Sequence, residues 1–429
     1  MQNITEEKVE VDIYKRSRIL YIIEAAVEYF SSILVSGAFL ATLTTNLGMS
    51  DSMTGVLTAL TSLGFCFQIL SILLSGVSSV KKLTIFGTLF QQALFVALYA
   101  LPFFDLSSNT KSVLIILFML GARAIGNIVY SPKIAWLMGL VDDRERGKFT
   151  AVKEMVSLLS GMLFTLGMGR IVDYFKDNGD INGAFITCAL TLFFISLSHL
   201  ITLFFIKEKP KSDAEMASAT VKKQLISIIK CKSFWRVVPV LMLWSIANYA
   251  SAPFYSTYLI SELAFSLTAV SIISIVSSLA RTTFSLPMGS FADKHGFSKT
   301  LIICLTIMTA AFGAMIFAAP GTKYLYVVYS VLFYIGMAGL NSSEINLVLD
   351  HTSHELRAGA LAIKGLICGM TGFLTTLLLT PLVDYVQANG NKIFGIDMYA
   401  QQLTSLISTA VCIIALIYLM FITKKAKKR

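Results

Sequence analysis

The sequence has little charge for its length. Asp, Glu, Lys and Arg make up 14% of its 429 residues, hydrophobic residues make up 55%, and the mean hydropathy is +0.74. Soluble globular domains carry about 25% charged residues. This scarcity of charge excludes a soluble globular domain and predicts a protein that crosses a membrane several times.

The sequence also lacks the spacings that build covalent, metal or catalytic sites. Its six cysteines are scattered, without paired spacing, and read as small apolar residues rather than disulfide or metal ligands. His351 and His354 have no third ligand nearby and are interpreted as loop residues. We find no phosphate loop, nucleophile elbow or zinc spacing. We therefore expect no enzyme, no cofactor and no metal.

A cleaved secretion signal is also missing. Residues 1–18, MQNITEEKVEVDIYKRSR, are polar and include acids, whereas a signal begins with basic residues followed by a short apolar segment. We expect these residues to form a cytoplasmic tail and the first apolar run to remain as a helix.

What the chain has in abundance is apolar runs of about 20 residues, the length that crosses a hydrocarbon core of about 30 Å. Twelve such runs predict an all-α integral membrane fold. The expected spans are 19–45, 53–77, 83–102, 112–139, 149–175, 183–206, 235–260, 267–291, 300–319, 324–350, 359–386 and 399–422.

The basic residues lie mostly on one side of this topology. With a cytoplasmic N-terminus, the inner segments hold 25 Lys and Arg and the outer loops hold four, namely Lys111, Lys176, Lys323 and Lys392. Because basic loops resist translocation, both termini are predicted to be cytoplasmic. The net charge of +10 therefore indicates membrane topology, and we expect no nucleic-acid partner.

The chain repeats itself at a distance of 211 residues. GRIVDYFKDNG at 169–179 is matched by TPLVDYVQANG at 380–390, and 12 of the 34 positions aligned between 146–179 and 357–390 are identical. The matched segments are the fifth and eleventh spans, which run in the same direction. The halves are therefore predicted to be parallel six-helix repeats related by an axis along the membrane normal.

This repeat sets the domain boundaries. We expect a tail at 1–18, a six-helix bundle at 19–206, a cytoplasmic linker at 207–234, a second bundle at 235–422 and a basic tail at 423–429. The second part of the linker is predicted either to lie along the inner membrane surface or to form a flexible loop.

Two six-helix halves joined by a cytoplasmic loop resemble the major facilitator superfamily of secondary transporters. GSFADKHGFSK at 289–299 looks like the loop signature of that family, and ERGKFT at 145–150 resembles its opening of helix 5. The corresponding first-half loop, SGVSSVKKL at 75–83, lacks the aspartate. The resemblance implies two six-helix bundles around a cavity that opens alternately to each side. It also implies that Asp293 attracts Arg146 and locks the inner ends of the helices.

Ionisable residues inside a membrane are costly and mark functional sites. Glu28 and Arg123 share a level about 14 Å from the inner edge of their spans, Glu24 lies one turn below Glu28, and Arg281 lies about 9 Å from the inner edge. One hypothesis makes Glu28, with Glu24, the proton-coupling site and Arg123 and Arg281 the receptors of an anionic group. The other holds that Glu28 and Arg123 simply neutralise each other.

Four further charges form a candidate inner gate. Lys133 and Glu344 are equivalent in the repeat, as are Lys153 and Lys364, and all lie within a turn or two of the inner face. A Lys153–Glu344 contact that breaks when the cavity opens inward would be such a gate. Side chains that snorkel to the interface are the alternative interpretation.

Asn248 and Tyr249 in the seventh span, and Gln68 in the second, complete the candidate substrate-binding residues. We expect secondary active transport of a small polar solute, an organic anion or a sugar-like molecule, driven by a proton or other ion gradient. One alternative is a drug or metabolite efflux antiporter. Drug/proton antiporters of the family that the chain resembles commonly carry a Gly-Pro-containing stretch late in helix 5, and SGMLFTLGMGRIVDY at 160–174 has no proline, which disfavours drug efflux. The other alternative is a membrane-embedded receptor or enzyme. We expect a monomer in the lipid bilayer of a bacterial cytoplasmic membrane.

Overall fold

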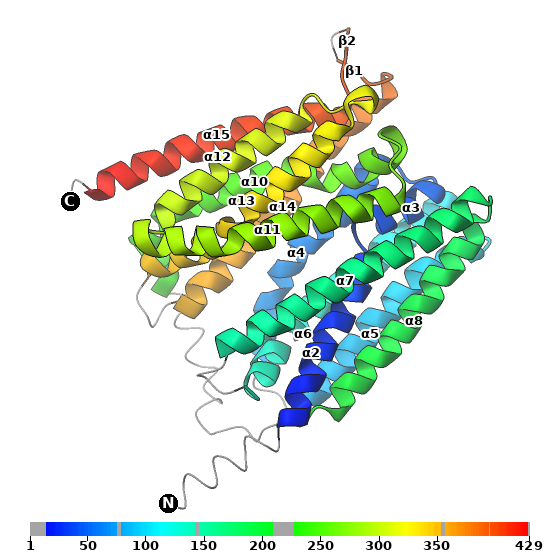
Figure 1. Ribbon diagram of the computed structural model, residues 1–429, viewed down its shortest axis with the longest axis horizontal. Coiled ribbons are helices and arrows are strands. Elements are labelled where there is room, and N and C mark those ends of the chain that lie inside the picture. Colours follow the sequence, from blue (N-terminus) through cyan, green and yellow to red (C-terminus); the bar gives the residue numbers. More distant parts are fainter. Residues whose placement is uncertain are drawn as a thin grey trace, which may run out of the picture. The chain divides into compact units, whose positions relative to one another are not determined.

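The computed structural model describes residues 14–74, 79–141, 146–208, 227–352, 357–393 and 395–427, and its long elements are all helices (Figure 1). The first half holds α2 (Lys15–Leu34), α3 (Gly37–Asn46), α4 (Asp51–Leu74), α5 (Val80–Ala100), α6 (Ser108–Met138), α7 (Arg146–Asp177) and α8 (Ile181–Phe205). The second half holds α10 (Lys232–Thr257), α11 (Leu267–His295), α12 (Phe297–Met315), α13 (Tyr324–Asp350), α14 (Arg357–Ala388) and α15 (Ala400–Lys427). Three short helices, η1 (Leu101–Phe103), η3 (Tyr258–Glu262) and η4 (Pro320–Thr322), and a hairpin of β1 (Lys392–Ile393) and β2 (Ile396–Asp397) complete the described elements.

Eleven helical segments in the described part of the chain are long and apolar enough to cross a membrane. The twelfth expected span, 53–77, corresponds to α4, which has 24 residues. The prediction of an all-α membrane fold is therefore confirmed. Most of the expected linker, residues 209–226, lies outside the described residues.

The first expected span is not one helix but two. α2 ends at Leu34 and α3 begins at Gly37, whose φ of +55° is a conformation that residues with a Cβ rarely adopt. The carbonyls freed by the break have side-chain partners: the Tyr99 hydroxyl donates to Leu34 O at 2.6 Å, and Nη2 of Arg123 donates to Val35 O at 3.4 Å. An unpaired carbonyl is costly in a membrane, so these two donors stabilise the break.

The chain reverses between α11 and α12 at a single residue. α11 continues to His295, beyond its expected end at 291, and α12 begins at Phe297. Between them Gly296 has φ +88°, and its N–H bonds Ala292 O at 2.8 Å. The stretch 289–299 that resembles a family loop signature is therefore almost entirely helical, with glycine supplying the turn.

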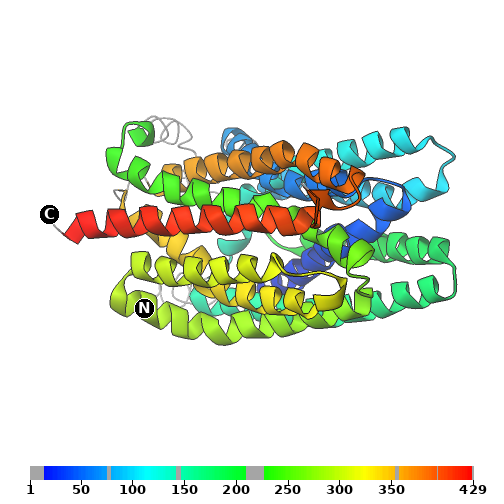
Figure 2. The same cartoon turned by 90° about the horizontal axis from the view of Figure 1, so that it is seen from above.

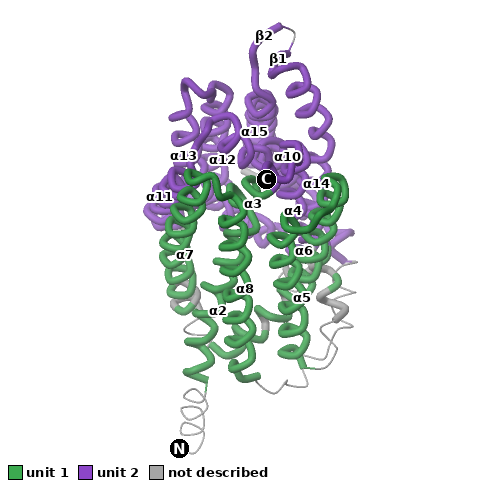
Figure 3. The backbone as a smooth tube through the Cα atoms, turned by 90° about the vertical axis from the view of Figure 1, so that its right-hand side faces the viewer, with its two compact units in different colours: residues 1–43, 67–218 green, residues 44–66, 219–429 purple. Residues whose placement is uncertain are grey.

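The described chain divides into two compact units, shown in Figure 3. Unit 1 comprises residues 1–43 and 67–218, and unit 2 comprises residues 44–66 and 219–429. In unit 1, α5 packs against α6 and α8, and α2 packs against α7 and α8. In unit 2, α12 packs against α13 and α15, and α10 packs against α14 and α15; Figure 2 shows α12 and α15 running side by side. These four pairings therefore occur at corresponding positions in the two units.

The first part of α4 packs on α14 within unit 2. The Ser62 hydroxyl donates to Gly369 O at 2.8 Å, and at the start of α4 the Ser52 hydroxyl donates to Oδ1 of Asp384. Asp51 accepts from Nε2 of Gln387 at 2.8 Å. Asp384, one of the repeated aspartates, thus serves as a hydrogen-bond acceptor for α4.

The cores of the two units differ in chemistry. Unit 2 buries an aromatic cluster around Tyr329, whose ring centroid lies 5.0 Å from that of Tyr255 and 5.5 Å from that of Phe333. Unit 1 buries a smaller apolar cluster that includes Tyr21 and Trp136. Unit 1 also buries the charges described next.

Candidate functional site

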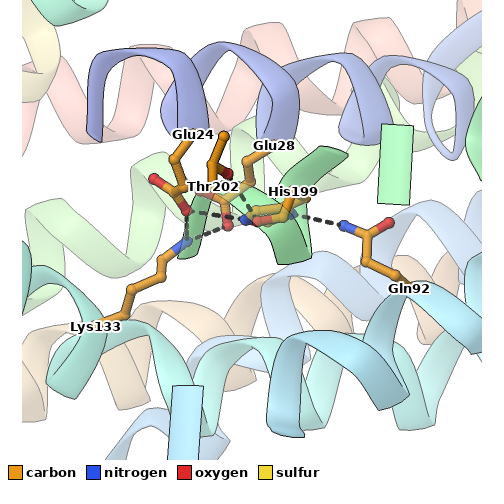
Figure 4. A network of polar contacts seen from close by, with 6 residues as sticks. All are labelled: Glu24, Glu28, Gln92, Lys133, His199 and Thr202. Carbon is orange, nitrogen blue, oxygen red and sulfur yellow. Dashed lines mark hydrogen bonds and ion pairs between the residues drawn. The ribbon is translucent and has the colours of Figure 1, made fainter. Parts of the chain in front are cut away.

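The candidate site is a chain of polar side chains inside unit 1, drawn in Figure 4. α2 supplies Glu24 and Glu28 one turn apart, on the same side of the helix. α6 supplies Lys133, α8 supplies His199, and α5 supplies Gln92. Four helices thus contribute to one site, which the helix pairings of unit 1 bring together.

Lys133 is the centre of this chain. Its ammonium nitrogen lies 3.1 Å from Oε1 of Glu24 and 2.6 Å from Oε1 of Glu28. The side chains of Lys133 and Glu24 are 4% and 1% exposed, whereas that of Glu28 is 40% exposed. One lysine is therefore shared by two carboxylates, one deeply buried and one partly exposed, so one negative charge of the three groups stays unbalanced.

Histidine continues the chain from Glu24. Nε2 of His199 lies 2.9 Å from Oε1 of Glu24, and Nδ1 lies 3.3 Å from Nε2 of Gln92. The Ser196 hydroxyl lies 3.1 Å from Oε1 of Gln92 and 2.6 Å from Leu192 O. His199, Gln92 and Ser196 are all buried, at 1%, 2% and 8% exposure.

The structure revises the expected partner of Glu28. Sequence depth paired Glu28 with Arg123 because both lie about 14 Å from the inner edge. The ammonium that bonds Glu28 belongs to Lys133, whose four-carbon stem reaches beyond its own level. Arg123 places its guanidinium 5.7 Å from the centroid of the Phe95 ring and donates to Val35 O at 3.4 Å.

The four candidate gate lysines and acids are distributed between the units. Glu344 bonds Nζ of Lys364 at 2.8 Å within unit 2. In unit 1, Lys133 joins the two acids of α2, and Nζ of Lys153 lies 5.2 Å from the centroid of the Tyr21 ring. Each of these residues has a partner in its own unit, and the Lys153–Glu344 gate stays a prediction.

The remaining candidates are placed in part. Arg281 is partly exposed on α11, with its charge near the Tyr334 hydroxyl. Asn248 lies on α10, and its buried Oδ1 has no hydrogen-bond partner among the described residues. Tyr249 follows it, and its carbonyl accepts from the Thr376 hydroxyl at 2.7 Å. The side chains of Gln68, Asp293 and Arg146 lie outside those that the structure describes.

Sequence reasoning missed His199 and Gln92. The rule that flagged buried charges also applies to histidine, and His199 lies about 10 Å from the inner end of the expected span 183–206. By the same measure Glu24 lies about 8 Å and Lys133 about 9 Å from the inner ends of theirs. Equal depth was therefore the signal that could have grouped these three residues.

The fold and the buried charges define a polytopic helical membrane protein of transporter type. The Major Facilitator Superfamily model matches residues 22–260 and 237–429, so the chain belongs to this family. The family and the fold indicate a transporter rather than an enzyme.

Similar structures and relatives transport different solutes. The nucleoside transporter NupG has a TM-score of 0.72 at 12% identity, covering 95% of this chain and 99% of that one. A D-xylose–proton symporter has a TM-score of 0.69 at 14% identity, covering 95% and 97%. The low affinity heme transporter str3 of Schizosaccharomyces pombe is 28% identical over 207 residues, 47% of this chain. The match spans only 29% of the length of str3.

Proposed function

We propose that this protein is a proton-coupled secondary transporter of a small polar solute, and that the Glu24–Glu28–Lys133–His199 site carries the proton. The observation that supports the proposal is the charge of this site. Two carboxylates and one ammonium leave a net charge of −1 when the imidazole is neutral. An unbalanced charge in a low-dielectric interior is costly, so binding of one proton lowers that cost.

The exposure of the site fits this role. A transported proton has to pass between water and a protected position, and Glu28 is 40% exposed while Glu24 is 1% exposed. Lys133 bonds both acids and so links the open position to the buried one. The driving force is then the proton gradient, with no bound cofactor, and the protein works as a monomer in the lipid bilayer.

The proposed solute is an organic anion or a sugar-like molecule. Arg281 is partly exposed and offers a guanidinium to a carboxylate or phosphate. Asn248 has a buried acceptor without a described partner, which suits a hydroxyl donor. The D-xylose–proton symporter has the same fold, which shows that this fold accommodates a proton-coupled sugar.

Heme is a second candidate, favoured by the str3 match. It is an organic anion with two carboxylates, but its large aromatic ring separates it from the small polar solutes proposed above. Its ring would need an aromatic or apolar binding surface.

The test begins with purified full-length protein and a panel of sugars, nucleosides, organic acids and heme. A ligand is identified by its stabilisation of the protein against thermal unfolding. The protein is then reconstituted in vesicles that enclose a pH-sensitive dye. We expect addition of that ligand to move protons, and Glu28→Gln to abolish the proton movement while ligand binding remains. Ligand flux that does not depend on a proton gradient would contradict the proposal. Chemical conversion of a ligand would indicate an enzyme.

A further inference from the structure

The polar chain beyond Glu24 has two complete hydrogen-bonding arrangements that differ by one proton. Resting on the proposed function, we infer that His199 is the residue that binds the coupled proton. We infer also that the terminal amide of Gln92 rotates by half a turn when His199 is protonated. The heavy atoms of the two arrangements differ only in that the oxygen and nitrogen of the Gln92 amide exchange places.

In the first arrangement the imidazole is neutral. Nε2–H of His199 donates to Oε1 of Glu24, and the bare Nδ1 accepts from the amide nitrogen of Gln92. The Ser196 hydroxyl then donates to Oε1 of Gln92. Both ring nitrogens of His199 and the Gln92 oxygen have partners of the right kind, so the neutral imidazole is held as one tautomer with its hydrogen on Nε2.

In the second arrangement the imidazole carries one more proton, on Nδ1. A half-turn of the terminal amide brings Oε1 of Gln92 to face Nδ1 and its nitrogen to face the Ser196 oxygen. The Ser196 hydroxyl then donates to Leu192 O, which already lies 2.6 Å away. Both ring nitrogens of His199, the Gln92 oxygen and the Ser196 hydroxyl each keep a partner, because the two ends of an amide have nearly the same shape.

The second arrangement also balances the charge. The added proton converts neutral imidazole to imidazolium, and the sum over Glu24, Glu28, Lys133 and His199 changes from −1 to zero. The imidazolium keeps its bond to the Glu24 carboxylate, which becomes an ion pair at the same distance. A carboxylate that took up the proton would instead lose part of its attraction to Lys133.

Each helix packed on the site presents polar or titratable groups to it. In the described chain, α5 presents the uncharged Gln92 to the imidazole, and its basic residues Lys81 and Lys82 lie about 15 Å away along the helix axis. α8 itself presents Ser196 and Thr202, whose hydroxyl donates to His199 O at 2.7 Å. The titratable groups of the other helices that lie near the site are Tyr21, Glu24 and Glu28 on α2, Tyr130 and Lys133 on α6, and Lys153 and Glu154 on α7.

Gln92 therefore acts as a positioning residue that stabilises both states of His199. Replacement by glutamate keeps the shape but offers only acceptors to Nδ1, which favours the protonated imidazole. Replacement by leucine removes the acceptor that the protonated imidazole needs, which favours the neutral form. Gln91 is the preceding residue on α5, and its side chain packs against Gly126 on α6. The same two replacements at Gln91 are therefore matched controls.

The experiment is nitrogen NMR of the purified full chain labelled in its histidine rings and glutamine amides. The His199 signals are assigned by their loss in His199→Gln. We expect the neutral form to carry its hydrogen on Nε2 and acidification to protonate Nδ1. The Gln92 amide signal should change at the same midpoint, and this change should vanish in His199→Gln.

The two Gln92 variants should shift the titration midpoint of His199 in opposite directions. We expect Gln92→Glu to raise the titration midpoint of His199 by at least one pH unit, a tenfold change in proton affinity, and Gln92→Leu to lower it by a similar amount. Both Gln91 variants should leave the midpoint unchanged. A neutral form with its hydrogen on Nδ1, or a midpoint that neither Gln92 variant moves, would overturn the inference.

The outcome is separable from that of the proposed function. If vesicle assays show flux without proton coupling while His199 titrates as described, the transport proposal fails and the two-state site stands. If flux is proton-coupled and His199 does not titrate with Gln92, the proton is carried by a carboxylate and the inference is wrong. Gln92→Glu is nearly isosteric, so it keeps the test decisive if Gln92→Leu does not fold.

Discussion

Gly372 on α14 lies directly against the ring of Tyr249 on α10: a Cβ built on the glycine would come 2.6 Å from ring carbon Cδ2. Its repeat counterpart, Gly161 on α7, lies in the same way against Tyr29 on α2, with a Cβ 2.2 Å from Cε1. The same glycine–tyrosine contact therefore joins the corresponding helices in both units.

This contact predicts that a single methyl group destabilises either unit. Gly372→Ala and Gly161→Ala should each lower the midpoint of thermal unfolding by several degrees, because a rigid ring has to move, at a cost of about 1–3 kcal/mol. Gly365→Ala on α14 and Gly167→Ala on α7 are controls, because a Cβ there meets nothing within 4 Å. Equal stability of all four variants would show that the helices separate at little cost.

The Glu344–Lys364 pair makes a second prediction, about stability in unit 2. Their side chains are 9% and 20% exposed and their charges lie 2.8 Å apart. Glu344→Gln leaves Lys364 without its carboxylate, so we expect a loss of about 2–4 kcal/mol, read as a lower unfolding midpoint. The double variant with Lys364→Met should recover most of the loss. A double variant less stable than Glu344→Gln would show that Lys364 contributes mainly through its stem.

Lys133 makes the sharpest prediction in unit 1. Lys133→Met leaves Glu24 and Glu28 without the ammonium they share, and we expect the protein to lose about 3–5 kcal/mol of stability, enough to reduce folded yield. Adding Glu24→Gln removes the more deeply buried charge and should restore folding. Size-exclusion profiles and thermal unfolding of the single and double variants measure this. Full stability of Lys133→Met would mean that the acids are held by other groups.

The break in the first span gives a prediction about a hydrogen bond between uncharged groups. Tyr99→Phe removes the donor to Leu34 O and leaves the ring in place, so we expect a loss of about 1–3 kcal/mol. Tyr255→Phe, which loses a bond to the Ser405 hydroxyl in unit 2, is the matched control and should cost less, because Ser405 also donates to Gln401 O. Thermal unfolding and protease cleavage near Gly37 would measure the difference. A larger effect for Tyr255→Phe would contradict it.

Periodicity and length predicted the architecture because a membrane leaves few choices. The expected span 267–291 begins where α11 begins, and the expected span 235–260 lies within α10 and η3. The repeat at 211 residues predicted two similar halves, and the helix pairings of the two units correspond. Bilayer thickness and backbone hydrogen bonding fix these features locally.

The partners within the site could not be predicted in the same way. Glu24 and Glu28 were expected to couple protons, but Lys133 was assigned to a gate, and His199 was not considered. Which acid a lysine reaches depends on how its flexible stem packs between helices. The break at Gly37 could not be predicted from the local sequence either, because the donors that stabilise it, Tyr99 and Arg123, come from other helices far along the chain.

That break gives the first membrane crossing a joint. The segment before it, α2, holds Glu24 and Glu28 of the proposed proton site, and the segment after it, α3, leads to the turn before α4. Because the carbonyls at the joint are bonded by side chains rather than by a continuous helical backbone, we expect that α2 can tilt without turning α3 through the same angle. Protonation of the buried site would then change the tilt of α2 alone, while α3, the second part of the same membrane crossing, keeps its orientation.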